Sequence, residues 1–88
     1  MATSVTQMSL IQARQELIDR RLARARELYL QANQEPTTRA DALLGLAHVA
    51  IMEQELDIAQ QLVQQASQLD PSPRAVLYSA MILGERGQ

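Results

Sequence analysis

The chain contains no cysteine, no phenylalanine and no tryptophan, and only two tyrosines. Without cysteine it can have neither a disulfide framework nor thiol chemistry. Because aromatic rings are nearly absent, its core must be built from Leu, Ile, Val, Met and Ala. Glycine and proline number three each and most of them fall at expected turns, which favours an all-helical domain over a β-sheet protein.

Long apolar runs are also missing. No stretch approaches the roughly 20 apolar residues that a helix needs to span a bilayer, and Met1 to Leu10 lacks the positive start and apolar block of a signal peptide. We therefore expect no direct membrane insertion. Localisation stays open: it is cytoplasmic if these 88 residues are the full protein, but the sequence can equally be a piece of a longer array.

Lysine is absent, so all eight basic residues are arginines, and ten acids give a net charge of −2. This balance disfavours general attraction to nucleic acid or anionic lipid. The charge is uneven, because residues 1–39 carry six Arg against four acids and residues 40–88 carry two Arg against six. Two such chains could associate head to tail.

The stretch from Ala40 to Pro71 has the pattern of two amphipathic helices joined by a tight turn. Apolar residues recur in each half at spacings of three and four: Leu43, Leu46, Ala47, Ala50 and Ile51 in the first, and Leu56, Ala59, Leu62, Val63, Ala66 and Leu69 in the second. Met52 to Glu55 lacks this period and is the expected turn. Pro71 ends the second helix, because proline disfavours helix in the residue before it.

This pattern resembles the tetratricopeptide repeat, a helix-turn-helix unit of roughly 34 residues with small and large apolar residues at fixed places and a late proline. The matching residues are Leu43, Leu46, Ala47, Ala50, Ala59, Val63, Ala66 and Pro71. Leu43, Ala50 and Val63 replace aromatic residues of the family, and Gln54 stands where a turn glycine is common. The resemblance implies an all-α fold of antiparallel helix pairs stacked as a short right-handed solenoid.

The same spacing recurs on both sides of this stretch. Upstream, four residues precede Leu56, Ala59, Val63 and Ala66 by 34 positions: Leu22, Ala25, Tyr29 and Ala32. Downstream, four residues follow Leu43, Ala47, Ala50 and Gln54 by 33 positions: Val76, Ala80, Leu83 and Gly87. We therefore predict one domain over residues 1–88, with about five helices in units 6–39, 40–73 and a partial 74–88.

The first unit has a less certain helix pattern. A helix is expected over Met8 to Ile18, with candidate caps at Thr3, Ser4 and Thr6. The repeat spacing favours a break around Asp19 to Arg21, and one continuous helix over residues 8–32 is the alternative.

Two later helix starts are marked by capping residues. Thr37 or Thr38 could cap the helix that follows the connector Asn33–Thr38. A fifth helix is expected from near Ser72, with Pro73 in its first turn, where a missing backbone donor costs little. Its outer apolar face is expected to be exposed.

The resemblance also implies a binding surface, because repeat stacks bind partners on the concave face lined by the first helix of each unit. Mapping the family's inward positions onto this chain selects Leu10, Arg14, Leu44, His48, Ile51, Leu77 and Met81. A mostly apolar groove suits an amphipathic helix or an extended apolar segment. The alternative is that neighbouring helices cover these residues. Leu44 and His48 replace the polar residues with which some members bind a terminal carboxylate, so that activity is not expected.

No catalytic, cofactor or metal site is expected. His48 is the only histidine, and without a second His or a Cys it is more readily a packed residue than a ligand. Glu53, Glu55 and Asp57 lie in or beside an expected exposed turn, without the apolar pocket that paired-carboxylate chemistry needs. The sequence has no Gly-rich phosphate loop or nucleophile elbow.

Four arginines lie close together in the first unit: Arg20, Arg21, Arg24 and Arg26. Arg20 and Arg24 would share a helical face and could contact phosphate. Interleaved acids favour a solvated face with local ion pairs instead. A nucleic-acid adaptor is therefore the third reading of function.

The first reading is a non-catalytic scaffold for protein partners. Repeats with this pattern are common in bacterial assembly and secretion systems, which is an implication of the resemblance alone. The second reading is a structural module whose apolar face serves self-association as a homo-oligomer, or packing against another domain of the same polypeptide.

Overall fold

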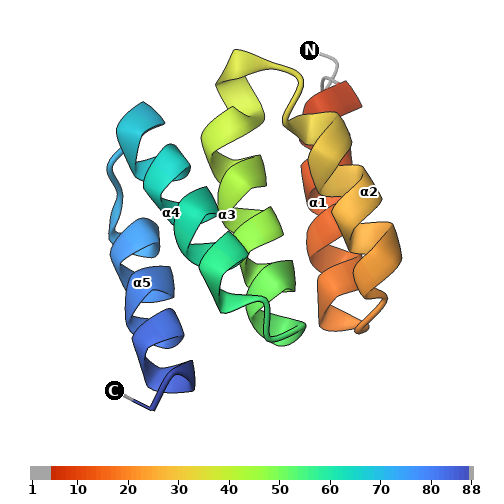
Figure 1. Ribbon diagram of the computed structural model, residues 1–88. Coiled ribbons are helices and arrows are strands. Elements are labelled where there is room, and N and C mark those ends of the chain that lie inside the picture. Colours follow the sequence, from red (N-terminus) through yellow and green to blue (C-terminus); the bar gives the residue numbers. More distant parts are fainter. Residues whose placement is uncertain (1–4, 88) are drawn as a thin grey trace.

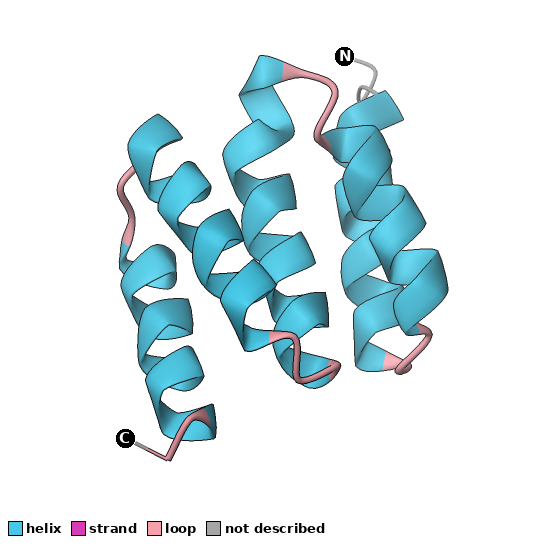
Figure 2. Cartoon of the chain, viewed as in Figure 1, coloured by secondary structure: helices cyan, strands magenta, loops and turns pink. Residues whose placement is uncertain are grey.

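The computed structural model describes residues 5–87 of the 88-residue chain. Over that range it consists of five α-helices and contains no strand (Figures 1 and 2). They are α1 (Val5–Ile18), α2 (Leu22–Ala32), α3 (Pro36–Met52), α4 (Leu56–Leu69) and α5 (Pro73–Glu85). The expectation of an all-α chain of about five helices is confirmed.

The helices stand in one row, with α1 and α2 at one end and α5 at the other (Figure 1). Helix α1 packs against α2, and α3 against α4, as antiparallel hairpins. Helix α2 also contacts α3, and α4 contacts α5, while α3 additionally touches both α1 and α5. Helix α3 therefore meets its own partner α4, the preceding second helix α2 and both neighbouring first helices, α1 and α5.

The turns at the ends of α1 and α3 have the same geometry. Arg20 and Gln54 both adopt left-handed backbone conformations, with φ of 64° and 63°. The amide of Arg21 donates to the carbonyl of Glu16, and that of Glu55 to Ala50, each at 2.8 Å. These are the bonds of a Schellman motif, which satisfies carbonyls at the end of a helix. The predicted break around Asp19 to Arg21 is confirmed.

The end of α5 continues this series. Gly87 has a φ of 76°, and its amide donates to the carbonyl of Gly84 at 3.1 Å. Left-handed residues thus stand at positions 20, 54 and 87, at the spacing of 34 and 33 residues read from the sequence. Gln54 occupies the turn position that glycine commonly fills, and Gly87 fills the equivalent position one unit later.

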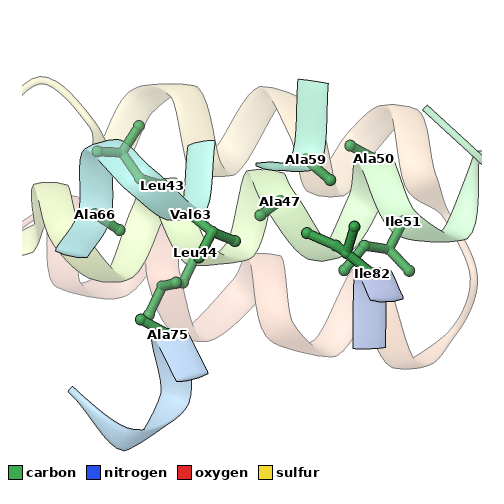
Figure 3. Close-up of a cluster of buried hydrophobic side chains, with 10 residues drawn as sticks. All are labelled: Leu43, Leu44, Ala47, Ala50, Ile51, Ala59, Val63, Ala66, Ala75 and Ile82. Carbon is green, nitrogen blue, oxygen red and sulfur yellow. The ribbon is translucent and has the colours of Figure 1, made fainter. Parts of the chain in front are cut away.

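Two clusters of buried side chains form the core. One joins α1, α2 and the near face of α3, and the other joins α3, α4 and α5 (Figure 3). Seven alanines are completely buried where helices cross: Ala13, Ala25, Ala32, Ala42, Ala47, Ala59 and Ala66. With no side chain beyond Cβ, alanine lets helix axes approach to about 8 Å.

Helix α3 begins four residues earlier than expected. It starts at Pro36, which occupies its first turn, where proline's missing donor is tolerated. The prediction that Thr37 or Thr38 caps this helix is wrong. Thr38 is buried at 3% exposure, and its hydroxyl donates to the Ala32 carbonyl at 2.6 Å, which ties the end of α2 to the start of α3.

The other capping predictions had mixed outcomes. Ser72 caps α5, since its hydroxyl accepts from the Ala75 amide and Pro73 follows in the first turn. Thr6 lies inside α1, where its hydroxyl donates to the Glu35 carboxylate at 3.0 Å across to the α2–α3 connector. Thr3 and Ser4 lie outside the described residues.

The contact between α2 and α3 depends on Gly45. A Cβ at this position would overlap the ring of Tyr29, which is buried at 3% exposure. One unit later, Val63 of α4 takes the position of Tyr29, and Tyr78 of α5 takes the position of Gly45. The tyrosine therefore lies on α2 in the interface between α2 and α3, but on α5 in the interface between α4 and α5.

Replacing Gly45 with alanine should therefore destabilise the fold. We expect Gly45→Ala to lower the free energy of unfolding by about 1–3 kcal/mol through overpacking against Tyr29, despite the higher helix propensity of alanine. Gly84→Ala is the matched control, because a Cβ there meets nothing within 4 Å; it should be neutral or stabilising. Urea unfolding at low protein concentration measures both, and equal effects would contradict the close packing.

The left-handed turn predicts a stabilising substitution. Arg20→Gly should raise the free energy of unfolding by about 1 kcal/mol, because this conformation costs residues with a Cβ about 1–2 kcal/mol. The same change at Arg24, inside α2, should cost about 1 kcal/mol. Thermal and urea unfolding of the pair distinguishes them, and a loss of stability in Arg20→Gly would count against the turn geometry.

Candidate functional site

The residues predicted to line a groove do not form one surface. Leu10, Leu44 and Ile51 are core residues, with exposed fractions of 6%, 2% and 4%. In Figure 3, Leu44 reaches towards Ala75 and Ile51 towards Ile82, so both link α3 to α5. These side chains are covered by the neighbouring helices, and a substitution at Leu44 would perturb folding before it perturbed binding.

The remaining four predicted residues are at least partly accessible. Arg14 on α1 and Leu77 on α5 are exposed, and His48 on α3 and Met81 on α5 are half-buried. Leu77 is 58% exposed, at the free end of the row. The sequence pattern thus identified helix positions that face a neighbouring first helix, and within residues 5–87 α5 has such a neighbour, α3, on one side only.

The accessible surface of α3 and α5 around His48 is polar. The hydroxyl of Tyr78 lies 3.4 Å from Nδ1 of His48, and the two rings are tilted by 53° with centroids 5.3 Å apart. Arg74, also on α5, forms an ion pair of 3.1 Å with Asp41 on α3. The expectation of a mostly apolar surface does not describe this part of the molecule.

Burial shifts two titrating groups here. The pKa of His48 is lowered by its burial and, to a lesser extent, by the positive charge of Arg74. Burial raises the pKa of Tyr29, as does Tyr78, against the opposing influence of Arg14 and Arg74. His48 is therefore a neutral, packed residue at neutral pH, in agreement with the reading of a packed histidine.

An apolar hollow that the sequence did not indicate lies between α2, α3 and α4. It has a volume of about 260 Å³ and is lined by Leu30 of α2, Leu46 and Ala50 of α3, and Ile58 and Leu62 of α4. Leu30 and Ile58 are 49% and 48% exposed, which is high for residues of their size. We call this feature the Leu30–Ile58 hollow.

Charged residues border the Leu30–Ile58 hollow at one end. Arg26, Glu53 and Glu55 contribute to its lining. Arg26 pairs with Glu53, which links α2 to the turn after α3. Glu55 forms no ion pair within residues 5–87, so the rim carries one uncompensated negative charge.

The arginines of the first unit are mostly paired. Arg21 pairs with Glu16 at 3.5 Å and Arg24 with Glu27 at 3.2 Å. Arg20 lies in the turn before α2 begins, so the prediction that Arg20 and Arg24 share a helical face is wrong. This arrangement favours the solvated face with local ion pairs.

Neither a metal-binding cluster nor a membrane-spanning helix is found in the described part of the chain. In residues 5–87, no three His, Cys, Asp or Glu side chains gather in a way that could hold a metal ion. Over the same range, no helix combines the length and apolarity needed to cross a bilayer.

Comparison with known proteins finds no matching family model, and no curated protein or solved structure matches significantly. The resemblance to the tetratricopeptide repeat therefore rests on the residues quoted above and on the recurring turns of the chain itself. Function has to be inferred from the geometry of its surfaces.

The lowered pKa of His48 predicts a pH dependence of stability. The unfolded chain, with a pKa near 6.5, binds a proton more readily than the folded one, so stability is complete above that value and is lost as pH falls towards the folded pKa. His48→Gln should therefore lose less stability than wild type between about pH 7.5 and about pH 5.5. Equal losses in urea titrations would show that His48 does not contribute.

Proposed function

We propose that this chain is a non-catalytic protein-interaction module, built as a short tetratricopeptide-like solenoid, that binds an apolar segment of a partner protein. The Leu30–Ile58 hollow is the observation that carries this proposal. Leu30 and Ile58 leave about half of their surface in water, at 49% and 48% exposure. An apolar partner residue placed between them would remove that surface from solvent, at about 25 cal/mol per Å².

The size of the hollow indicates what it binds. Small-molecule sites usually occupy about 300–1,000 Å³, and the hollow, at about 260 Å³, falls below that range and is open at its mouth. It fits one or two protruding side chains of a helix or an extended segment better than an enclosed metabolite. This is the binding mode of a helix in a groove, with a few apolar anchors.

The rim adds a charge preference. Glu53 is neutralised by Arg26, and Glu55 is left without an ion pair within residues 5–87. A partner segment with Leu, Ile or Met side chains flanked by Lys or Arg would complement both the apolar floor and the acidic end. Such a rim contact contributes more to specificity and association rate than to affinity.

The proposal is tested by selecting ligands from a random-peptide phage library on the folded domain. We expect the selected peptides to share apolar anchors and at least one basic residue. Ile58→Glu should lower their affinity at least about tenfold, because it places a charge where an apolar anchor binds. Ile11→Glu is the matched control, at a residue of α1 that is 61% exposed and does not line the hollow, and should bind as wild type does.

Circular dichroism establishes that both variants remain folded. Peptides that bind wild type and Ile58→Glu equally would move the binding surface elsewhere. Failure to select any peptide above background would count against a peptide-binding role altogether.

A further inference from the structure

The outward side of α5 is apolar along its whole length. The residues on this arc recur at spacings of three and four: Pro73, Val76, Leu77, Ala80, Leu83, Gly84 and Gly87. All seven are exposed, and Val76, Leu77 and Leu83 reach 70%, 58% and 55%. None carries a charge or a polar side chain. We call this surface the α5 arc.

The charged side chains of α5 and of the turn after it contact the rest of the molecule instead. Arg74 pairs with Asp41 on α3, and Arg86 pairs with Asp57 on α4. Glu85 accepts a hydrogen bond from the side chain of Gln54 at 3.0 Å. The absence of charge on the α5 arc is therefore a property of one side of the helix rather than of the helix as a whole.

The repeat register indicates what kind of element this surface accepts. Val76, Ala80 and Leu83 follow by 33 positions the residues with which α3 packs against α4: Leu43, Ala47 and Ala50. Those three are exposed by only 5%, 0% and 5%. The α5 arc thus has the side-chain pattern of a surface that an antiparallel helix covers.

Gly84 indicates how closely that element approaches. A Cβ at Gly84 would meet no atom within 4 Å, so no contact within residues 5–87 requires glycine there. Glycine inside a helix costs about 1 kcal/mol relative to alanine. The equivalent residue one unit earlier is Ile51, which is 4% exposed beneath α5. A glycine in the open at this place suits a backbone that approaches from another molecule.

We propose that two copies of this chain associate through their α5 arcs as an antiparallel, two-fold symmetric pair. With Ala80 on the axis, Val76 of one copy faces Gly84 of the other, Pro73 faces Gly87, and Leu77 faces Leu83. Large residues thus meet small ones at the close crossing, and two leucine pairs flank it. In a two-fold interface each contact occurs twice.

Charge favours a second copy over a different partner. A two-fold axis brings a surface against itself, so any charge near the axis would face a like charge. The α5 arc has none, and it offers no charged group with which to recognise a charged partner. The α1 surface differs in this respect, since Arg14, Gln7 and Gln15 interrupt its exposed apolar residues.

The pair is weak and concentration-dependent. Helix α5 has 13 residues and is about 20 Å long, and a single antiparallel pair of such helices buries less than the roughly 1,200–2,000 Å² of a stable interface. We therefore expect a reversible dimer that dissociates on dilution.

Sedimentation velocity of the wild-type chain over a concentration series tests the association. We expect reversible conversion from the 9.8 kDa chain to a species of twice that mass, with nothing larger. Ala80→Glu and Ala80→Lys should each abolish the dimer by placing like charges on the axis, while an equimolar mixture of the two should restore it. Ile11→Glu, an equally polar change on the far end of the row, should dimerise as wild type does.

The absence of cysteine allows a second, independent measurement. Ala80→Cys should form a disulfide-linked dimer on mild oxidation, whereas Ala23→Cys, an exposed residue of α2, should stay monomeric under the same conditions. A wild-type chain that is monomeric throughout the series overturns the proposal. So do masses that grow beyond the dimer, which indicate head-to-tail stacking, and a glutamate and lysine mixture that remains monomeric.

Discussion

Close contact between helices through alanine determines the shape of this chain. Seven alanines are completely buried, and they take the places where larger side chains would hold the helices apart. With no Phe or Trp in the sequence, the chain could not fill wide gaps between helices. The result is a row of helices 45 Å long and only 17 Å thick, with a large surface for its size and few layers of core. Both ends of the row consequently leave apolar side chains in water.

The same close contacts decide which surfaces remain for function. Where α3 packs against α1 and α5, apolar side chains are buried between the helices. The groups left accessible around His48 and Tyr78 are polar. The second helices α2 and α4 do not contact each other directly across α3, and the gap between them is where the Leu30–Ile58 hollow opens. An accessible apolar surface in this fold is therefore found where two helices do not contact each other, and apolar spacing along one helix does not locate it.

The sequence predicted the helices and most of their boundaries correctly, because the periodic spacing of apolar residues depends only on residues close together in the chain. The break at Asp19 to Arg21 followed from the repeat even though no glycine or proline marks it. The start of α3 was predicted too late, because a proline such as Pro36 can follow one helix or begin the next. The hydrogen bond from Thr38 to the Ala32 carbonyl joins α2 to α3. Such a contact between two helices cannot be read from spacing along the sequence. The groove residues were misjudged for a related reason: spacing identifies a helix face but not the helix that covers it. The hollow is lined by Leu30, Leu46 and Ile58 from three different helices. The sequence pattern of a single helix cannot predict that these residues lie together.

The pairs Tyr29–Gly45 and Val63–Tyr78 place the large residue on opposite helices in the two interfaces, and this difference bears on which helices can dock together. In a repeated structure, the misplacement to consider is α5 docked on α2 in the place of α3. That misplacement would set Tyr29 of α2 against Tyr78 of α5, where only one ring fits, and would leave Val63 of α4 over Gly45 with a void. Each second helix thus carries a side chain that is sized for its own neighbour. The two tyrosines, the only large aromatic residues of the sequence, thus make the two interfaces differ in shape, and the native order of helices is the one in which each ring has a small residue opposite it.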